Sequence, residues 1–260
     1  MTLAVHRLLT VDQLRELLTP GAAGTANWSR RLNALARAGL VQAQRSRGTG
    51  GYKLWCATPA GLRAALADRG PRRAYSAADT AGVLGAHTYA VNEVGFAFLR
   101  SARTRGEDCE WEHEVMHRVG TGRGRSGRLI ADAVVAYERH PDRGRLVRFV
   151  EVDRATEPLA RLVGQARAYA RYHRAGAWTD RYGRWPAVAV VVGANPARAP
   201  EAVERRIRRF LESCAADPQL RRLPLLVTSH EQLTADGPWS AVWSRPDYPG
   251  TPVDGHGETP

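Results

Sequence analysis

The sequence has few cysteines, almost no lysine and no long apolar run, and these shortages exclude several classes of protein. Its three cysteines are odd in number and widely spaced, so they build neither a disulfide framework nor a zinc ribbon. Its apolar runs fall short of the roughly 20 residues that a membrane-spanning helix needs. The N-terminus also lacks the cleavage pattern of a signal peptide. Together these absences predict a cytoplasmic protein without membrane insertion.

Positive charge is abundant although lysine is scarce. All but one of the 38 Lys and Arg residues are arginine, the exception being Lys53, and the formal net charge is +12. Such a surplus of positive charge favours a polyanionic partner. The 260 residues, 43% of them hydrophobic, can bury a core and suffice for one large domain or two modest ones.

Residues 1–70 have the element order of a winged helix-turn-helix. The segment from Thr10 to Gln13 has the spacing of a capping box and opens a first helix. A second helix is predicted from about Thr25 to Ala38, followed by two short strands and by a further helix that opens at Thr58-Pro59. We therefore predict a DNA-binding domain here, whereas a small protein-binding scaffold is the alternative.

The second helix would enter the major groove, and the hairpin would contact phosphates from the wing. The residues predicted to bind DNA are the polar and cationic ones of these two elements: Asn27, Arg30, Arg31, Arg37, Arg45, Arg47 and Lys53.

Residues 79–243 alternate between helical and strand patterns. The order is helix, strand, hairpin strands, helix, strand, helix and strand, which predicts an α/β domain with a mixed sheet flanked by helices. Gly70–Arg73 is a candidate linker before it. From residue 244 to residue 260 proline and glycine dominate, so we expect a disordered tail.

Two carboxylates stand out in the centre of that domain. Leu129–Tyr137 and Leu146–Val152 are apolar and β-branched, and the turn-forming segment between them predicts a hairpin. Asp132 lies near the start of the first strand and Glu151 near the end of the second, so the two side chains should converge. A carboxylate pair at short range is unfavourable unless a proton or a cation is shared, and hard oxygen ligands suit Mg²⁺ or Mn²⁺. Asp132 and Glu151 are thus the predicted metal ligands.

This pattern resembles a known nuclease core. Asp132, then Glu151 and Asp153 on the next strand, then a helix with Gln165 and Tyr169, is similar to the PD-(D/E)xK superfamily and its Q-x-x-x-Y element. The run Glu151–Glu157, EVDRATE, resembles the Glu-x-Asp-Arg-x-Thr signature of the plasmid replication-relaxation family. That resemblance implies an N-terminal winged helix joined to a restriction-endonuclease-like domain, related to some mobilisation relaxases.

The resemblance implies a function in plasmid replication, relaxation or mobilisation, with double-stranded DNA as partner. A second copy of the chain and replication or conjugation proteins are further candidate partners. As an enzyme it would be a Mg²⁺- or Mn²⁺-dependent endonuclease, with candidate catalytic positions Asp132, Glu151, Asp153, Arg154, Gln165 and Tyr169. Asp153 departs from the superfamily pattern, which usually has lysine there, and Arg154 is the nearest cation. A DNA-binding regulator or accessory protein without catalysis therefore remains the alternative.

A competing motif lies just upstream. His113-Glu-Val-Met-His117 matches H-E-x-x-H, which on a helix holds zinc and would make the protein a zinc hydrolase. However, the apolar residues around it alternate with polar ones, and this alternation predicts a strand. On a strand the two histidines would share a face about 13 Å apart, which is too far for one zinc ion.

Overall fold

The computed structural model describes residues 1–66, 74–119, 127–138 and 145–254. Two compact units divide between Asn92 and Glu93, inside helix α6 (Val83–Thr104). This division lies later in the chain than the predicted interval between residues 70 and 79, because Leu84 and Tyr89 pack against the core of the first unit. The candidate linker and the turn at residues 140–144 lie outside the described residues.

Unit 1 combines short helices with a small antiparallel sheet. Its helices are α1 (Thr2–His6), α2 (Val11–Leu18), α3 (Ala26–Arg37), α4 (Pro59–Ala65), α5 (Ala77–Ala81) and the first part of α6. Strands β1 (Leu8–Leu9), β3 (Lys53–Ala57) and β2 (Val41–Arg45) lie in that order, and a 3-10 turn, η1 (Arg47–Thr49), follows β2. The arrangement is consistent with the expected winged helix.

Two predicted helix starts are confirmed in unit 1. Thr10 and Gln13 form a capping box, in which each side chain accepts a hydrogen bond from the other residue's backbone N–H, at 3.1 and 2.9 Å. Thr58 caps α4 by accepting from the N–H of Gly61 at 3.1 Å, and Pro59 occupies the first turn.

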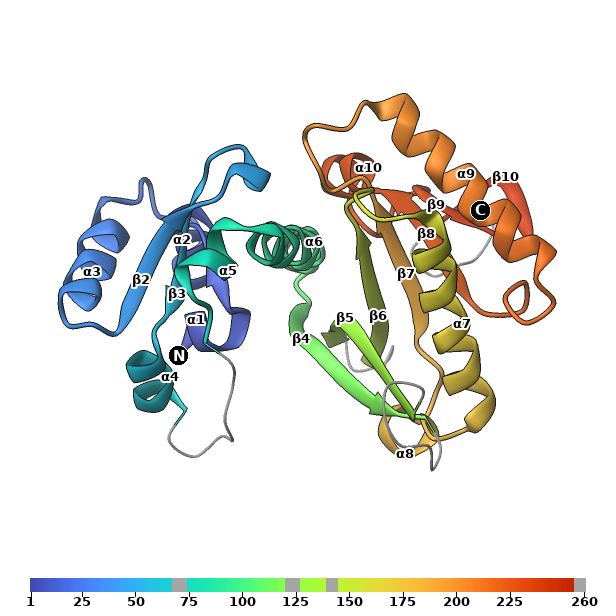
Figure 1. The fold of residues 1–260 in the computed structure, drawn as a ribbon, viewed down its shortest axis with the longest axis horizontal. Helices are drawn as coiled ribbons and strands as arrows, with labels where there is room; N and C mark the ends of the chain where they lie inside the picture. The colour runs from blue at the N-terminus through green and yellow to red at the C-terminus, as the bar shows by residue number, and fades with distance from the viewer. Residues whose placement is uncertain (67–73, 120–126, 139–144, 255–260) are drawn as a thin grey trace. The chain divides into compact units, whose positions relative to one another are not determined.

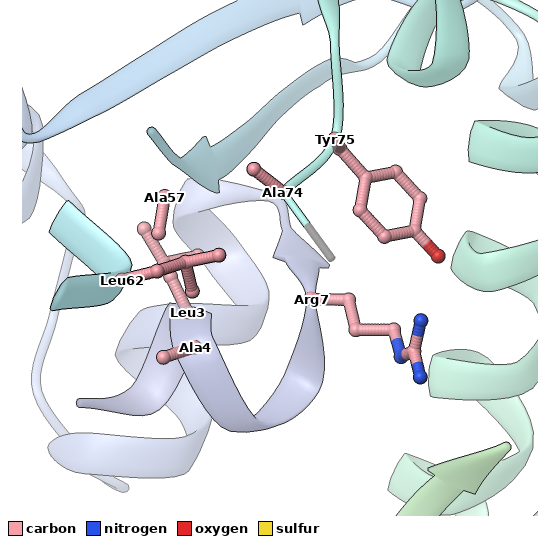
Figure 2. A pocket seen from close by; sticks show the side chains of 7 residues that line it. All are labelled: Leu3, Ala4, Arg7, Ala57, Leu62, Ala74 and Tyr75. Carbon is pink, nitrogen blue, oxygen red and sulfur yellow. The ribbon is translucent and has the colours of Figure 1, made fainter. Parts of the chain in front are cut away.

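The core of unit 1 forms around strands β1 and β3. Leu8, Leu54 and Cys56 are buried with Tyr75, whose hydroxyl shares a 2.9 Å hydrogen bond with Thr88. The cavity beside this core is about 10 Å³ in volume, and Figure 2 shows its lining of apolar side chains together with Arg7 and Tyr75. This volume is no larger than about one water molecule, so the packing is nearly complete there.

Packing around α3 is much looser. Its apolar side, with Trp28, Leu32 and Leu35, lines a groove of about 450 Å³ that α1, α2 and α4 complete. Leu32 is buried whereas Leu35 is 40% exposed. Helix α3 is therefore a largely surface-exposed element of unit 1.

Unit 2 is a seven-stranded mixed sheet flanked by helices, as predicted. The strand order is β10-β9-β8-β7-β6-β5-β4. The strands are β4 (Asp108–Arg118), β5 (Arg128–Glu138), β6 (Arg145–Asp153), β7 (Ala187–Val192), β8 (Leu225–Ser229), β9 (Trp243–Arg245) and β10 (Tyr248–Val253). Strands β6, β7 and β8 run parallel, and the remaining pairs are antiparallel.

The helices cover both faces of this sheet. Helices α7 (Leu159–Ala175) and α9 (Pro200–Ala216) pack side by side against one face (Figure 1). Phe149, Tyr169 and Phe210 are fully buried between them and the sheet. The second half of α6 packs beside β4 and β5, where Tyr137 donates a hydrogen bond to the carbonyl of Phe98. Short helices α8 (Thr179–Tyr182) and α10 (His230–Asp236) complete the unit.

The C-terminal segment differs from the expected disordered tail. Strands β9 and β10 fall largely within residues 244–260 and form an antiparallel pair at the edge of the sheet. Trp243 and Val253, which are paired across the two strands, are both buried, so apolar contacts order a segment whose composition is rich in proline and glycine. Across the described parts of the chain, no helix is both long and apolar enough to cross a bilayer.

Candidate functional site

Asp132 and Glu151 lie opposite each other where strands β5 and β6 separate. The hydrogen-bonded ladder of these strands runs from Glu138↔Arg145 to Ala133↔Val150, and the next pair in register is Asp132 with Glu151. Beyond the last backbone pair, the Asp132 side chain links the two strands: its Oδ2 accepts a 2.8 Å hydrogen bond from the N–H of Val152. The hairpin register thus brings the two carboxylates together, as the sequence predicts.

Helix α7 supplies the partners of Glu151. Gln165 and Tyr169 are four residues apart and share a helical face. Oε1 of Glu151 accepts from the Tyr169 hydroxyl at 2.5 Å and from Gln165 Nε2 at 3.1 Å. Gln165 Nε2 also donates to the carbonyl of Ile130 on β5 at 3.0 Å. Two side chains of one helix therefore hold both strands at the point where the carboxylates meet.

The electrostatics of the pair favour a proton on Glu151. Burial raises the pKa of this carboxyl well above its usual value, and the charge of Asp132 raises it further. Hydrogen bonds from Tyr169, Gln165 and the Asp132 backbone act in the opposite direction without cancelling the rise. Burial, followed by the charge of Glu151, likewise raises the pKa of Tyr169. The site is a buried carboxyl and phenol beside a second, half-buried carboxylate.

Asp153 has a different partner. It lies two residues after Glu151 on β6, and its carboxylate forms an ion pair with Arg206 of α9. Arg206 Nη2 donates to Asp153 Oδ1 at 3.1 Å and to the carbonyl of Glu157 at 2.9 Å. Oδ1 of Asp153 also accepts from the N–H of Ala155 at 3.1 Å. Asp153, the residue that departs from the resemblance described above, thus holds an arginine of α9.

No sequence pattern indicated that Arg206 belongs to this region. The neighbouring Arg205, Arg208 and Arg209 are exposed, whereas the Arg206 side chain is only 15% exposed. Its partner is 53 residues earlier in the chain, so no local spacing rule could reveal the pair. Arg154, the nearest cation in sequence, is also buried, and its Nε donates to the carbonyl of Ala194 at 3.4 Å. Burial lowers the pKa of Arg154.

A metal ion at Asp132 and Glu151 would need ligands beyond carboxylate and imidazole side chains. Among the residues that the structure describes, no group of three or more His, Cys, Asp or Glu gathers in a metal-binding arrangement. The two carboxylates fit a hard cation by their chemistry, because a cation between them would offset both the burial and the repulsion by Asp132 that raise the pKa of Glu151. The other predicted positions, Gln165 and Tyr169, surround this pair, whereas Asp153 is engaged with α9.

The histidines of the H-E-x-x-H motif lie on strand β4, as predicted, but they do not share an environment. His113 Nε2 accepts a 3.2 Å hydrogen bond from Trp111 Nε1, and the Trp111 ring packs edge-on against Phe96 of α6. The ring of His117 instead packs among aromatic rings on the α7 side of the sheet: Phe149, Tyr172 and Tyr182.

The expectation that these histidines face the same way is therefore wrong, and the backbone between them gives the physical reason. Glu114 has a positive φ of 48°, which interrupts the regular alternation of the strand. His117 Nε2 shares a 2.6 Å hydrogen bond with the hydroxyl of Tyr182. Burial, followed by the nearby charge of Arg181, lowers the pKa of His117 to about 4. This histidine is a neutral core side chain.

Unit 1 presents the predicted DNA-binding residues on its surface. Asn27, Arg30, Arg31 and Arg37 are exposed on α3, and Arg45 and Lys53 are exposed on the hairpin of β2 and β3. The guanidinium of Arg31 lies 5.1 Å from the Trp28 ring centroid, and the ammonium of Lys53 lies 4.5 Å from that of Trp55. Arg45 Nη1 donates to the carbonyl of Gly51 at 3.1 Å. The side chain of Arg47 lies outside the described part of the structure.

Comparison with models of protein families gives a match over most of the chain. Residues 1–188 match a family model described as replication-relaxation. No curated protein matches the chain. The matched range covers all of unit 1 and the part of unit 2 that carries Asp132, Glu151, Gln165 and Tyr169.

Proposed function

The chain belongs to the replication-relaxation family, and on that premise we propose that it is a DNA-binding protein of plasmid replication, relaxation or mobilisation. In this proposal unit 1 docks on duplex DNA. The observation that carries it is the exposed cationic surface formed by α3 and the β2–β3 hairpin. A helix with exposed Asn and Arg side chains can read base edges in the major groove, and hairpin cations can contact phosphates. The net charge of +12 supports the same partner.

The test changes this surface and leaves the core alone. Replacing Arg30, Arg31, Arg37 and Arg45 by Gln should weaken binding to a labelled duplex by roughly a hundredfold at moderate salt. Each phosphate contact releases counterions from the DNA, and the variant would lose that favourable contribution at every contact it no longer makes. Fluorescence anisotropy at several salt concentrations measures the affinity and its salt dependence.

A charge-matched variant controls for the loss of four positive charges. It carries Gln at four exposed arginines of unit 2: Arg171, Arg174, Arg221 and Arg222. The control should keep an affinity close to wild type. Equal weakening by both variants would refute unit 1 as the DNA-docking surface. The loss of affinity would then reflect only the lower net charge.

A second candidate activity is metal-dependent nicking of DNA, and the convergence of Asp132 and Glu151 favours it. The residues that would hold Mg²⁺ or Mn²⁺ are Asp132 and Glu151, through oxygens of their carboxylates. A bound ion supplies an activated water and stabilises charge on the phosphate. Glu151 must release its proton for the ion to bind, while Gln165 keeps its carboxyl in place. Arg154 and Gln165 are the proposed orienting groups for the substrate.

Thermal melts and a supercoiled-plasmid assay test this second activity together. Mn²⁺ should raise the melting temperature of the wild type and of the exposed control Asp108→Asn, but not that of Asp132→Asn. Nicking should disappear in Asp132→Asn, in which the amide oxygen of Asn can still accept from the N–H of Val152. A wild-type melting temperature indifferent to metal, with no nicking, would leave the non-catalytic DNA-binding protein as the function.

A further inference from the structure

Unit 2 contains a cationic pocket that lies apart from the paired carboxylates. Its volume is about 200 Å³, and four arginines line it: Arg198, Arg205, Arg206 and Arg209. It is formed by the segment after β6, the start of α7, and the loop and helix that follow β7. The carboxyl ends of parallel strands, such as β6 and β7, are where open α/β sheets commonly bind ligands.

The charge of this pocket is largely uncompensated. Arg206 is neutralised by Asp153 and fixed further by the carbonyl of Glu157. Arg198, Arg205 and Arg209 are exposed, and within the described ranges none of the three takes part in an ion pair. No carboxylate is among the described side chains that line the hollow. Three positive charges therefore face one space around a rigidly held fourth arginine.

The shape and chemistry of the pocket specify a phosphate group. Guanidinium groups present planar pairs of donors that match phosphate oxygens, and they stay charged at all physiological pH values. Pockets for drug-sized ligands run from about 300 to 1,000 Å³, so this one suits a smaller group. Leu159 and Val203 give it an apolar floor that can contact the carbon atoms of a sugar.

We propose that this pocket binds a phosphate group of a DNA strand, so that unit 2 contacts DNA independently of the surface of unit 1. The inference rests on the proposed DNA-binding function and adds a second contact site to it. Asp153 is then a positioning residue: it holds Arg206 at the pocket instead of acting beside Glu151. The same chemistry would also accept free phosphate, and the experiment below separates the two sources.

The experiment uses the full chain and a variant that leaves the buried Asp153–Arg206 pair intact. Replacing Arg198, Arg205 and Arg209 by Gln should weaken binding of a fluorescent DNA oligonucleotide at least tenfold. The magnitude of the log–log salt slope should fall by about 1, since the pocket holds one phosphate and about one counterion is released per phosphate contact. The control replaces Arg208, Arg221 and Arg222, which do not line the pocket, and it should bind as the wild type does.

A second variant keeps the test decisive if the triple change disturbs folding. Ala202→Glu places a carboxylate in the pocket on α9, and Ala160→Glu places one on an exposed position of α7. The first should weaken DNA binding and the second should not. Equal affinities of both for DNA would overturn the proposal.

Titration with inorganic phosphate, followed by NMR of the arginine Nε–H groups, identifies the ligand source. If phosphate binds at the pocket but the triple variant keeps its DNA affinity, the ligand is a free phosphate compound and the DNA contact is refuted. The unit 1 variant described above separates this result from a failure of the whole function. If neither the unit 1 variant nor the pocket variant alters DNA binding, both proposals fail. If only the unit 1 variant does, the pocket alone is refuted.

Discussion

The buried imidazole of His117 should make unit 2 lose stability in mild acid. Its pKa is lowered from 6.5 to about 4, first by burial and then by the charge of Arg181. His117 is harder to protonate in the folded state than in the unfolded state. Its contribution to the free energy of unfolding is therefore fully present above pH 6.5 and is lost as the pH falls toward 4. A difference of 2.5 pKa units, at about 1.4 kcal/mol each, corresponds to a total of roughly 3 kcal/mol. About 2 kcal/mol of this should disappear between pH 7 and pH 5.

The variant His117→Gln isolates this effect, since Gln is neutral at every pH and can still hydrogen-bond to the hydroxyl of Tyr182. Urea unfolding of wild type and variant, followed by circular dichroism from pH 4 to pH 8, gives the two stability curves. The difference between them should shrink by about 2 kcal/mol from pH 7 to pH 5. NMR titration of the imidazole should give a pKa near 4. Parallel curves for the two proteins would refute the assignment of His117 as a neutral core residue.

Two further changes test the packing of unit 2 and the buried carboxyl. Gly95→Ala should cost about 1–3 kcal/mol in urea unfolding, because its Cβ would collide with the buried Trp111 indole. The matched control Gly164→Ala meets open space and should instead stabilise α7 by up to about 1 kcal/mol. Tyr169→Phe removes a hydrogen bond that lowers the pKa of Glu151, so it should cost about 1–3 kcal/mol. A carboxyl with a raised folded pKa loses stability as the pH rises through that pKa, and the variant raises the pKa of Glu151 further, so this cost should not be smaller at pH 8 than at pH 4.5. A smaller cost at pH 8 would contradict the raised pKa of Glu151.

The sequence alone determined the features that depend on neighbouring residues. The capping box at Thr10 and Gln13 needs only four residues, and it forms as predicted. Apolar, β-branched runs joined by a short connection fixed strands β5 and β6 and the register that sets Asp132 against Glu151. Helical spacing likewise placed Gln165 and Tyr169 on one face, where both reach Glu151.

Only the tertiary structure decided the features that depend on distant segments or on irregular backbone. Asp153 pairs with Arg206 across 53 residues, and nothing near either residue indicates the other. The positive φ of Glu114 accounts for the different surroundings of His113 and His117, which alternate regularly in the sequence. Alternation of residue types cannot reveal a single irregular dihedral angle. Strand β10 forms because burial of Val253 against the sheet outweighs a local composition that disfavours strands. In each case the deciding free energy comes from contacts that exist only after the chain has folded.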